Sequence, residues 1–272
     1  MMHVRSGVVR AVAGAAGLIV GAVAGCQPAA RGEEANASAE VGSAVHAEST
    51  PKAGFASHPG STEDSAFDLV FTAVRREGDE LVFVERVSGR AGVTVPTPAG
   101  KLAGAEVFSY VWPTSLDPSV VEFEEGTGTL ALAATSHPDF DDTPLYDEDG
   151  DGDNGNDGRL WHSHWVVLTP DPECGAGSLK VRDIPEGAEP RLPATWPGLP
   201  LFIDSPGYEP DISGAEIRVP VPLKELGFPA DFSYDGVTAA LRVNESVHNP
   251  LLCVSEVFDV ASGDLSLPGT VG

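Results

Sequence analysis

Short apolar runs separated by glycine and proline organise the chain from about residue 66 onward. Residues 67–74 and 81–87 are rich in Val and Phe and flank a Glu-Gly-Asp turn, a pattern that predicts a β-hairpin. The same pattern predicts later strands at residues 105–112, 128–134, 160–168, 178–182, 201–203, 215–219, 237–243 and 251–260. Only residues 222–227 favour a helical turn, ended by Gly227.

Strands at roughly ten-residue spacing, with turn residues between them, predict an all-β fold. The full chain contains 31 glycines and 23 prolines, which leave little room for long helices. We expect residues 66–272 to form one β-sandwich domain, of the jelly-roll or immunoglobulin-like type. A long acidic loop should join the strands at 128–134 and 160–168.

The amino terminus has the layout of a secretory signal. Residues 1–10 carry two arginines, and residues 11–25 form an apolar run that is shorter than the roughly 20 residues of a membrane span. The run ends Val23-Ala24-Gly25-Cys26, which resembles a bacterial lipobox. This resemblance implies that residues 1–25 are a signal peptide and that Cys26 is lipidated, so that the membrane is a partner through the lipid anchor.

The residue after the lipobox refines the expected location. Gln27, rather than aspartate, follows Cys26, which in the lipoprotein class implies the outer membrane where the cell has one. The alternative is an uncleaved anchor helix with an incidental cysteine. Residues 26–65 are rich in small and polar residues, with Phe55 as the only aromatic one, and predict a flexible tether.

Cysteine usage agrees with export. Without Cys26, the chain keeps Cys174 and Cys253, an even pair in an oxidising compartment. We predict a disulfide between them, closing a loop of roughly 80 residues and contributing on the order of 3 to 4 kcal/mol. Two buried free thiols are the alternative.

A formal net charge of −25 disfavours nucleic acid as a partner and favours basic partners or divalent cations. An acidic surface suited to a salty habitat would give the same charge. Locally, nine acidic residues and no lysine or arginine lie between Asp139 and Asp157. Two carboxylates about 5 Å apart repel by roughly 0.8 kcal/mol even in water, so a cation among them would stabilise the loop.

The centre of this acidic segment resembles the first half of an EF-hand calcium loop. Residues 147–153 match its early ligand and turn positions, but the twelfth position is Gly158 instead of a bidentate glutamate. The resemblance implies a weak structural calcium site, with a dissociation constant of roughly 0.1 to 1 mM. The expected ligands are Asp147, Asp149, Asp151, Asp153, Asn156 and Asp157. An acidic loop without an ion is the alternative.

A second candidate metal site involves histidines. His162 and His164 should point to the same side of a strand, about 6.6 Å apart, a spacing used by zinc or copper sites. His137, at the end of the preceding strand, would add a third nitrogen, and Asp139 or Asp141 an oxygen. Histidines that hydrogen-bond to neighbouring carboxylates are the alternative.

Three functions remain open at this point. The first is a non-enzymatic, lipid-anchored module of the cell envelope that holds structural calcium and meets an unidentified extracytoplasmic ligand or protein. The second is a zinc- or copper-dependent enzyme or metal-binding protein centred on the histidines. The third is a carbohydrate-binding module that uses aromatic stacking. Its candidate residues are Trp112, Trp161, Trp165 and Trp196, for which core packing is the alternative role.

Overall fold

The computed structural model describes residues 54–141, 145–227, 231–246 and 250–272. They belong to one compact unit, Ser49–Gly272. The predicted signal peptide, the lipobox and Cys26 lie outside the described residues. Within the described ranges every helix is a single short turn, far shorter than a bilayer-spanning helix. These turns are η1 (Pro118–Val121), η2 (Asp157–Arg159), η3 (Pro172–Cys174) and η4 (Leu223–Leu226).

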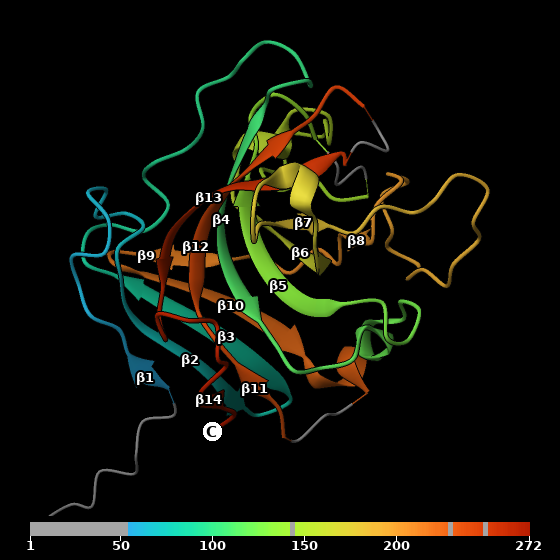
Figure 1. Cartoon of the computed structure of the whole chain (residues 1–272). Coiled ribbons are helices and arrows are strands. Elements are labelled where there is room, and N and C mark those ends of the chain that lie inside the picture. Colours follow the sequence, from blue (N-terminus) through green and yellow to red (C-terminus); the bar gives the residue numbers. More distant parts are fainter. Residues whose placement is uncertain (1–53, 142–144, 228–230, 247–249) are drawn as a thin grey trace, which may run out of the picture. The chain divides into compact units, whose positions relative to one another are not determined.

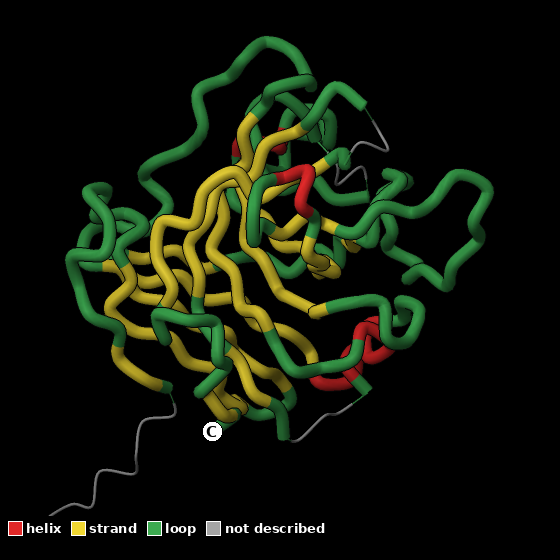
Figure 2. Tube along the Cα trace, viewed as in Figure 1, coloured by secondary structure: helices red, strands yellow, loops and turns green. Residues whose placement is uncertain are grey.

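Antiparallel sheets form the framework of the described chain, as Figures 1 and 2 show. The first sheet is open and contains, in spatial order, β1 (Phe55–Ala56), β2 (Leu69–Glu77), β3 (Glu80–Val87), β10 (Glu216–Pro222) and β9 (Asp211–Ser213). A separate two-stranded pair consists of β11 (Ser233–Tyr234) and β14 (Gly269–Thr270).

The other sheet closes on itself. Its strands, in spatial order, are β5 (Thr129–Ser136), β4 (Glu106–Pro113), β12 (Val237–Val243), β13 (Leu252–Val260), β7 (Leu179–Val181) and β6 (His162–Pro170), and β8 (Ile203–Asp204) also pairs with β6. Because β5 pairs with β6 as well as with β4, these six strands form a closed ring. We call them the closed sheet. Its inner face forms a second apolar core.

The all-β prediction is confirmed, while the jelly-roll or immunoglobulin-like type of sandwich stays a prediction. The first hairpin forms where the sequence places it, with Glu77 opposite Glu80 and with Gly78 in the left-handed conformation (φ 67°) that the turn requires. The acidic segment joins β5 to β6, two adjacent strands, as expected.

Buried apolar residues alternate with more exposed residues along the strands, and the buried ones form the core between the open and closed sheets. On β10, Ile217, Val219 and Val221 are fully buried, whereas the residues between them are half-buried. They share a core with Phe83 of the open sheet and Trp165 of the closed sheet, whose rings meet edge to face with centroids 5.9 Å apart. Side chains two residues apart lie on the same face of a strand, so the apolar face is the one that packs inward.

The folded part begins before its predicted start at Ala66. Strand β1 lies in the segment that was expected to be tether, and it pairs with β2. Asp68 holds the following turn, because its Oδ1 accepts hydrogen bonds from the backbone N–H groups of Gly60 (2.6 Å) and Ser61 (2.9 Å). A strand of two residues is too short to show an alternating apolar pattern, so the sequence did not predict β1.

The predicted disulfide between Cys174 and Cys253 is confirmed. It joins η3 to β13 with a Cα–Cα distance of 5.4 Å. The pairing of β13 with β7 consists of one residue pair, Cys253 with Lys180. The disulfide therefore reinforces the weakest junction of the closed sheet.

Candidate metal centre beside an apolar cavity

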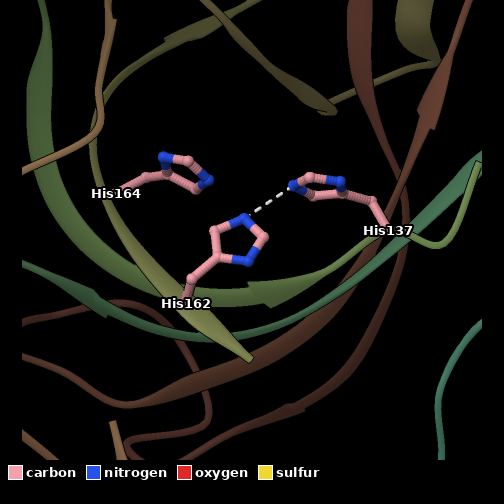
Figure 3. A group of neighbouring side chains, drawn as sticks. All are labelled: His137, His162 and His164. Atoms are coloured by element: carbon pink, nitrogen blue, oxygen red, sulfur yellow. Dashed lines mark hydrogen bonds between the residues drawn. The ribbon is translucent and has the colours of Figure 1, made fainter. Parts of the chain in front are cut away.

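Strands β5 and β6 bring three histidines together. His162 and His164 lie two residues apart on β6, and His137 directly follows β5. All three are buried, and one ring nitrogen of each lies within 4.8 Å of the other two. Figure 3 shows these nitrogens turned toward a common point. The structure thus places the three predicted nitrogen ligands side by side.

The other nitrogen of each ring faces a backbone carbonyl. His137 Nδ1 lies 2.6 Å from Phe140 O, and His162 Nδ1 lies 2.9 Å from Leu160 O. His164 Nδ1 lies 3.1 Å from Asp204 O, in the neighbouring strand β8. A carbonyl oxygen only accepts hydrogen bonds, so each Nδ1 carries the ring proton and each Nε2 keeps a lone pair.

The three ring nitrogens form a group that could hold a metal ion. The Nε2 atoms of His137 and His162 are 2.8 Å apart, and Thr135 Oγ1 lies 3.5 Å from His162 Nε2. Two lone pairs that face each other at 2.8 Å repel, so a cation between the two rings would stabilise them. A shared proton is the alternative, and it would leave an imidazolium at a buried position. A metal needs little movement, since zinc–nitrogen bonds of about 2.0 to 2.1 Å in tetrahedral geometry place the nitrogens about 3.3 Å apart. Carbonyl-bound Nδ1 atoms are the usual support for such ligands.

The two aspartates proposed as oxygen ligands are not part of this group in the described residues. Both carboxylate oxygens of Asp139 accept backbone hydrogen bonds at 2.7 Å, from the N–H groups of Ala99 and Gly100. Asp139 therefore holds a neighbouring turn. Asp141 is half-buried at the edge of the described segment.

His137 and His164 border a cavity of about 320 Å³ on the inner face of the closed sheet. Its wall is almost entirely aliphatic, with residues such as Val107, Val166 and Leu241. Polar side chains enter the wall at five positions: Ser109, Thr129, Thr135, His137 and His164. Among the described residues, Ser109 Oγ is fully buried and has no hydrogen-bond partner.

This arrangement defines the chemistry that the site can support. Three neutral nitrogen ligands leave a fourth tetrahedral position, as in zinc sites that bind water or a ligand. A metal held there would act as a Lewis acid and would lower the pKa of a bound water to about 7. The residues that line the described cavity include no Asp, Glu, Lys or Arg, so the wall adds no other strong acid or base.

The acidic loop forms a second, separate cluster. One carboxylate oxygen from each of Asp147, Asp149 and Asp157 lies within 4.8 Å of the others. Asp147 and Asp149 are exposed, but Asp157 is fully buried. Asp157 Oδ2 accepts a hydrogen bond from Glu148 N (3.1 Å), whereas its Oδ1 has no partner in the described part of the chain.

Asp151 and Asp153 accept hydrogen bonds from the loop backbone, as Asp147 and Asp149 also do. Asp151 Oδ1 accepts from Asp153 N (2.8 Å), and Asp153 Oδ1 accepts from Gly155 N (3.1 Å). Asn156 Nδ2 donates to Asp151 Oδ2 (2.9 Å). These three side chains lie outside the cluster of Asp147, Asp149 and Asp157 as the described residues define it.

Gly158 shows why the loop departs from the EF-hand pattern at its twelfth position. A Cβ atom there would lie 1.9 Å from Phe140 O and 2.8 Å from His137 O. No side chain fits, so glutamate is excluded and the buried carboxylate comes from the preceding residue, Asp157. The same backbone contact joins the end of the acidic loop to the segment that carries His137.

The four tryptophans do not share an exposed face. Trp112 and Trp165 are fully buried in the core between the sheets. Trp161 and Trp196 are half-buried, and their Nε1–H groups donate to Gly92 O (2.9 Å) and Leu201 O (3.1 Å). A sugar platform would have to use these last two alone.

Sequence reasoning missed the groups that orient His164. Asp204 provides the carbonyl oxygen, and Ser205 Oγ lies 3.2 Å from His164 Nδ1. Burial raises the pKa of the Asp204 carboxyl to about 6, although Thr195 Oγ1 donates a 2.6 Å hydrogen bond to it. A backbone carbonyl can accept this hydrogen bond whatever the side chain of its residue is, so the amino-acid sequence could not predict the contact with His164.

Comparison with known proteins gave no match, whether by family model, by curated protein or by solved structure. The three histidines and the cavity are therefore the features of this chain that bear on its function.

Proposed function

We propose that this chain is an exported, lipid-anchored protein of the cell envelope that binds zinc or copper through His137, His162 and His164. The observation that carries the proposal is the convergence of one ring nitrogen from each buried histidine, while each Nδ1 faces a backbone carbonyl. The disulfide and the lipobox-like residues 23–26 support the exported location. We also propose that the open sheet and the facing strands of the closed sheet constitute a β-sandwich.

Metal analysis of the purified full chain tests this function. We expect one zinc or copper ion per chain, and an affinity at least about 100-fold lower after His162→Ala together with His164→Ala. His58→Ala is the matched control, because His58 is exposed and belongs to no metal group in the described residues. A wild-type chain that binds neither metal, while its melting curve shows it to be folded, overturns the proposal.

Binding is favoured over catalysis as the role of this centre. The cavity wall contributes hydroxyl groups and imidazoles but no carboxylate or ammonium group in its described lining. Turnover would therefore depend on the metal alone, whereas the apolar wall is suited to retaining a ligand.

A second function, structural calcium binding, is favoured by Asp157. A fully buried carboxylate oxygen without a hydrogen bond is unfavourable unless a cation or a donor satisfies it. Asp147 and Asp149 lie close enough to share that cation. We propose that these three residues form the core of the calcium site, with the ion stabilising the loop between β5 and β6.

Thermal melting with calcium and with a chelator tests this second function. Calcium at tenfold over its dissociation constant should stabilise the chain by about 1.4 kcal/mol. Asp157→Asn should abolish the shift, and the control Asp153→Asn, in the same loop, should leave most of it. Identical midpoints with calcium and chelator for the wild-type chain would remove the calcium role.

A further inference from the structure

The cavity has a buried polar end and an exposed apolar end. His137 and His164 line it with exposed fractions of 2% and 1%, whereas Val257 and Leu265 line it with exposed fractions of 49% and 42%. A ligand would therefore enter past aliphatic side chains and meet the imidazoles last. Such a gradient fits a molecule with an apolar tail and one polar head.

The volume limits the size of that molecule. A group the size of a water molecule takes up about 30 Å³, so a cavity of about 320 Å³ holds about ten non-hydrogen atoms. Because the wall is aliphatic along its length, most of those atoms should be carbon.

Ser109 adds a second fixed contact for the polar head. Its register partner on β5 is Thr135, whose own partner on β6 is His162. Two steps between strands place the backbone of Ser109 about 10 Å from that of His162, across the polar end of the cavity. The Ser109 hydroxyl is fully buried, lines the cavity and has no hydrogen-bond partner among the described residues, so an acceptor on a ligand would satisfy it.

We propose that the cavity binds a medium-chain fatty acid of about eight carbons, with one carboxylate oxygen on the metal and the other accepting a hydrogen bond from Ser109 Oγ. This inference rests on the proposed metal site. A carboxylate, unlike an alcohol, has two acceptor oxygens, so it can bind the metal with one and accept the hydrogen bond from Ser109 with the other. It also offsets the charge of a divalent ion held by neutral imidazoles.

The loop after β13 forms the entrance. Leu265 and Leu267 both line the cavity, and both have positive φ values, 58° and 53°. Leucine rarely adopts this left-handed conformation, which is unfavourable for residues with a Cβ atom. The loop holds two strained residues where their side chains partly cover the cavity, an arrangement suited to letting a ligand enter and leave.

Calorimetric titration of the zinc-loaded full chain tests the ligand. Cys26→Ser in every sample removes the lipid attachment point, so the chain can be handled without competing lipid. We expect octanoate to bind at one site per chain and acetate to bind at least about 100-fold more weakly, because acetate buries no tail. We expect 1-octanol to bind at least about tenfold more weakly than octanoate, because it cannot contact both the metal and Ser109.

Two variants test the contacts of the apolar tail and of the carboxylate separately. Ala239→Leu fills part of the cavity wall and should abolish octanoate binding while zinc remains bound; Ala188→Leu, at an exposed position, is its control. Ser109→Ala should weaken octanoate about five- to tenfold, whereas Ser255→Ala, on an exposed part of β13, should not. In the cobalt-substituted chain, octanoate should shift the visible absorption bands of the metal and 1-octanol should not.

The outcomes of these measurements are distinguishable. A chain that binds zinc but not octanoate overturns the ligand assignment and leaves the metal site standing. Octanoate that binds equally well with and without metal, or no better than 1-octanol, overturns the metal–carboxylate contact. A chain that binds neither zinc nor copper overturns the proposed function itself, and metal analysis detects this result without any fatty acid present.

Discussion

Three backbone carbonyls decide which nitrogen of each histidine faces the others. The carbonyls of Leu160 and Phe140 lie near their own histidines in sequence, whereas that of Asp204 comes from a different strand. The two-residue spacing of His162 and His164 correctly predicted that they share a face of β6. Their ring protonation could not be predicted, because it depends on carbonyls whose positions only the folded backbone sets.

Glu85, on β3, provides a test at the residue scale. Burial, and then the negative charges of Asp235 and Asp259, raise the pKa of its carboxyl well above the usual value, although Val237 N donates a hydrogen bond to Oε1. Between the usual value and the raised pKa, the folded chain holds a proton that the unfolded chain has lost. The free energy of unfolding should therefore fall as pH rises through that window.

Glu85→Gln should flatten this dependence and raise stability at pH 7.5 relative to the wild-type chain. Urea unfolding between pH 4.5 and pH 7.5 measures the effect. Glu80→Gln, at an exposed position on the same strand, is the matched control. Parallel pH curves for the wild-type chain and Glu85→Gln would show that Glu85 is not the group responsible.

At the scale of elements, the sequence pattern predicted the long strands and the short strands β7 and β8, but it missed four other short strands. The strand predicted at residues 237–243 coincides with β12, and the helical turn predicted at 222–227 contains η4. By contrast β1, β9, β11 and β14 have two or three residues each, too few for an alternating pattern. Their positions depend on partners elsewhere in the chain, which a local pattern cannot supply.

The junction between the acidic loop and the end of β5 provides a second test. Gly158→Ala should push the backbone of residues 137–140 outward, because its Cβ would overlap Phe140 O. We expect a loss of about 1 to 3 kcal/mol in stability and a 10- to 100-fold lower zinc affinity, since Phe140 O orients His137.

Urea unfolding and competition with a zinc chelator measure these two effects of Gly158→Ala. Gly155→Ala is the control in the same loop, where the new Cβ would meet only Asp153 Oδ1, at 3.2 Å. Equal losses in the two variants would contradict a specific link between the loop and His137.

At the scale of the molecule, cysteine counting predicted the disulfide, but no sequence signal predicted the ring. Closure depends on β5 pairing with β6 and on β13 meeting β7 at one residue pair. The cavity follows from this closure, so its volume and its position beside the histidines could not be read from the strand pattern.

Removing the disulfide tests how much that junction contributes. Cys174→Ser together with Cys253→Ser should lower the free energy of unfolding by about 2 to 4 kcal/mol, because the bond closes a loop with a sequence separation of 79 residues. Urea midpoints with and without a reductant measure it, and Cys26→Ser is the control. An unchanged midpoint in the double variant would mean that strand pairing alone secures the ring.

The place of β13 in the chain determines when an enclosed chamber can exist. Residues 252–260 complete the ring, whereas the histidines lie more than eighty residues earlier, at 137–164. If the chain is exported with its amino terminus first, as proposed, all three imidazoles emerge long before the closed sheet can surround the cavity. A ligand can therefore be enclosed only after residues 252–260 have emerged, and a chain truncated before residue 250 would keep its proposed metal ligands but lose the cavity.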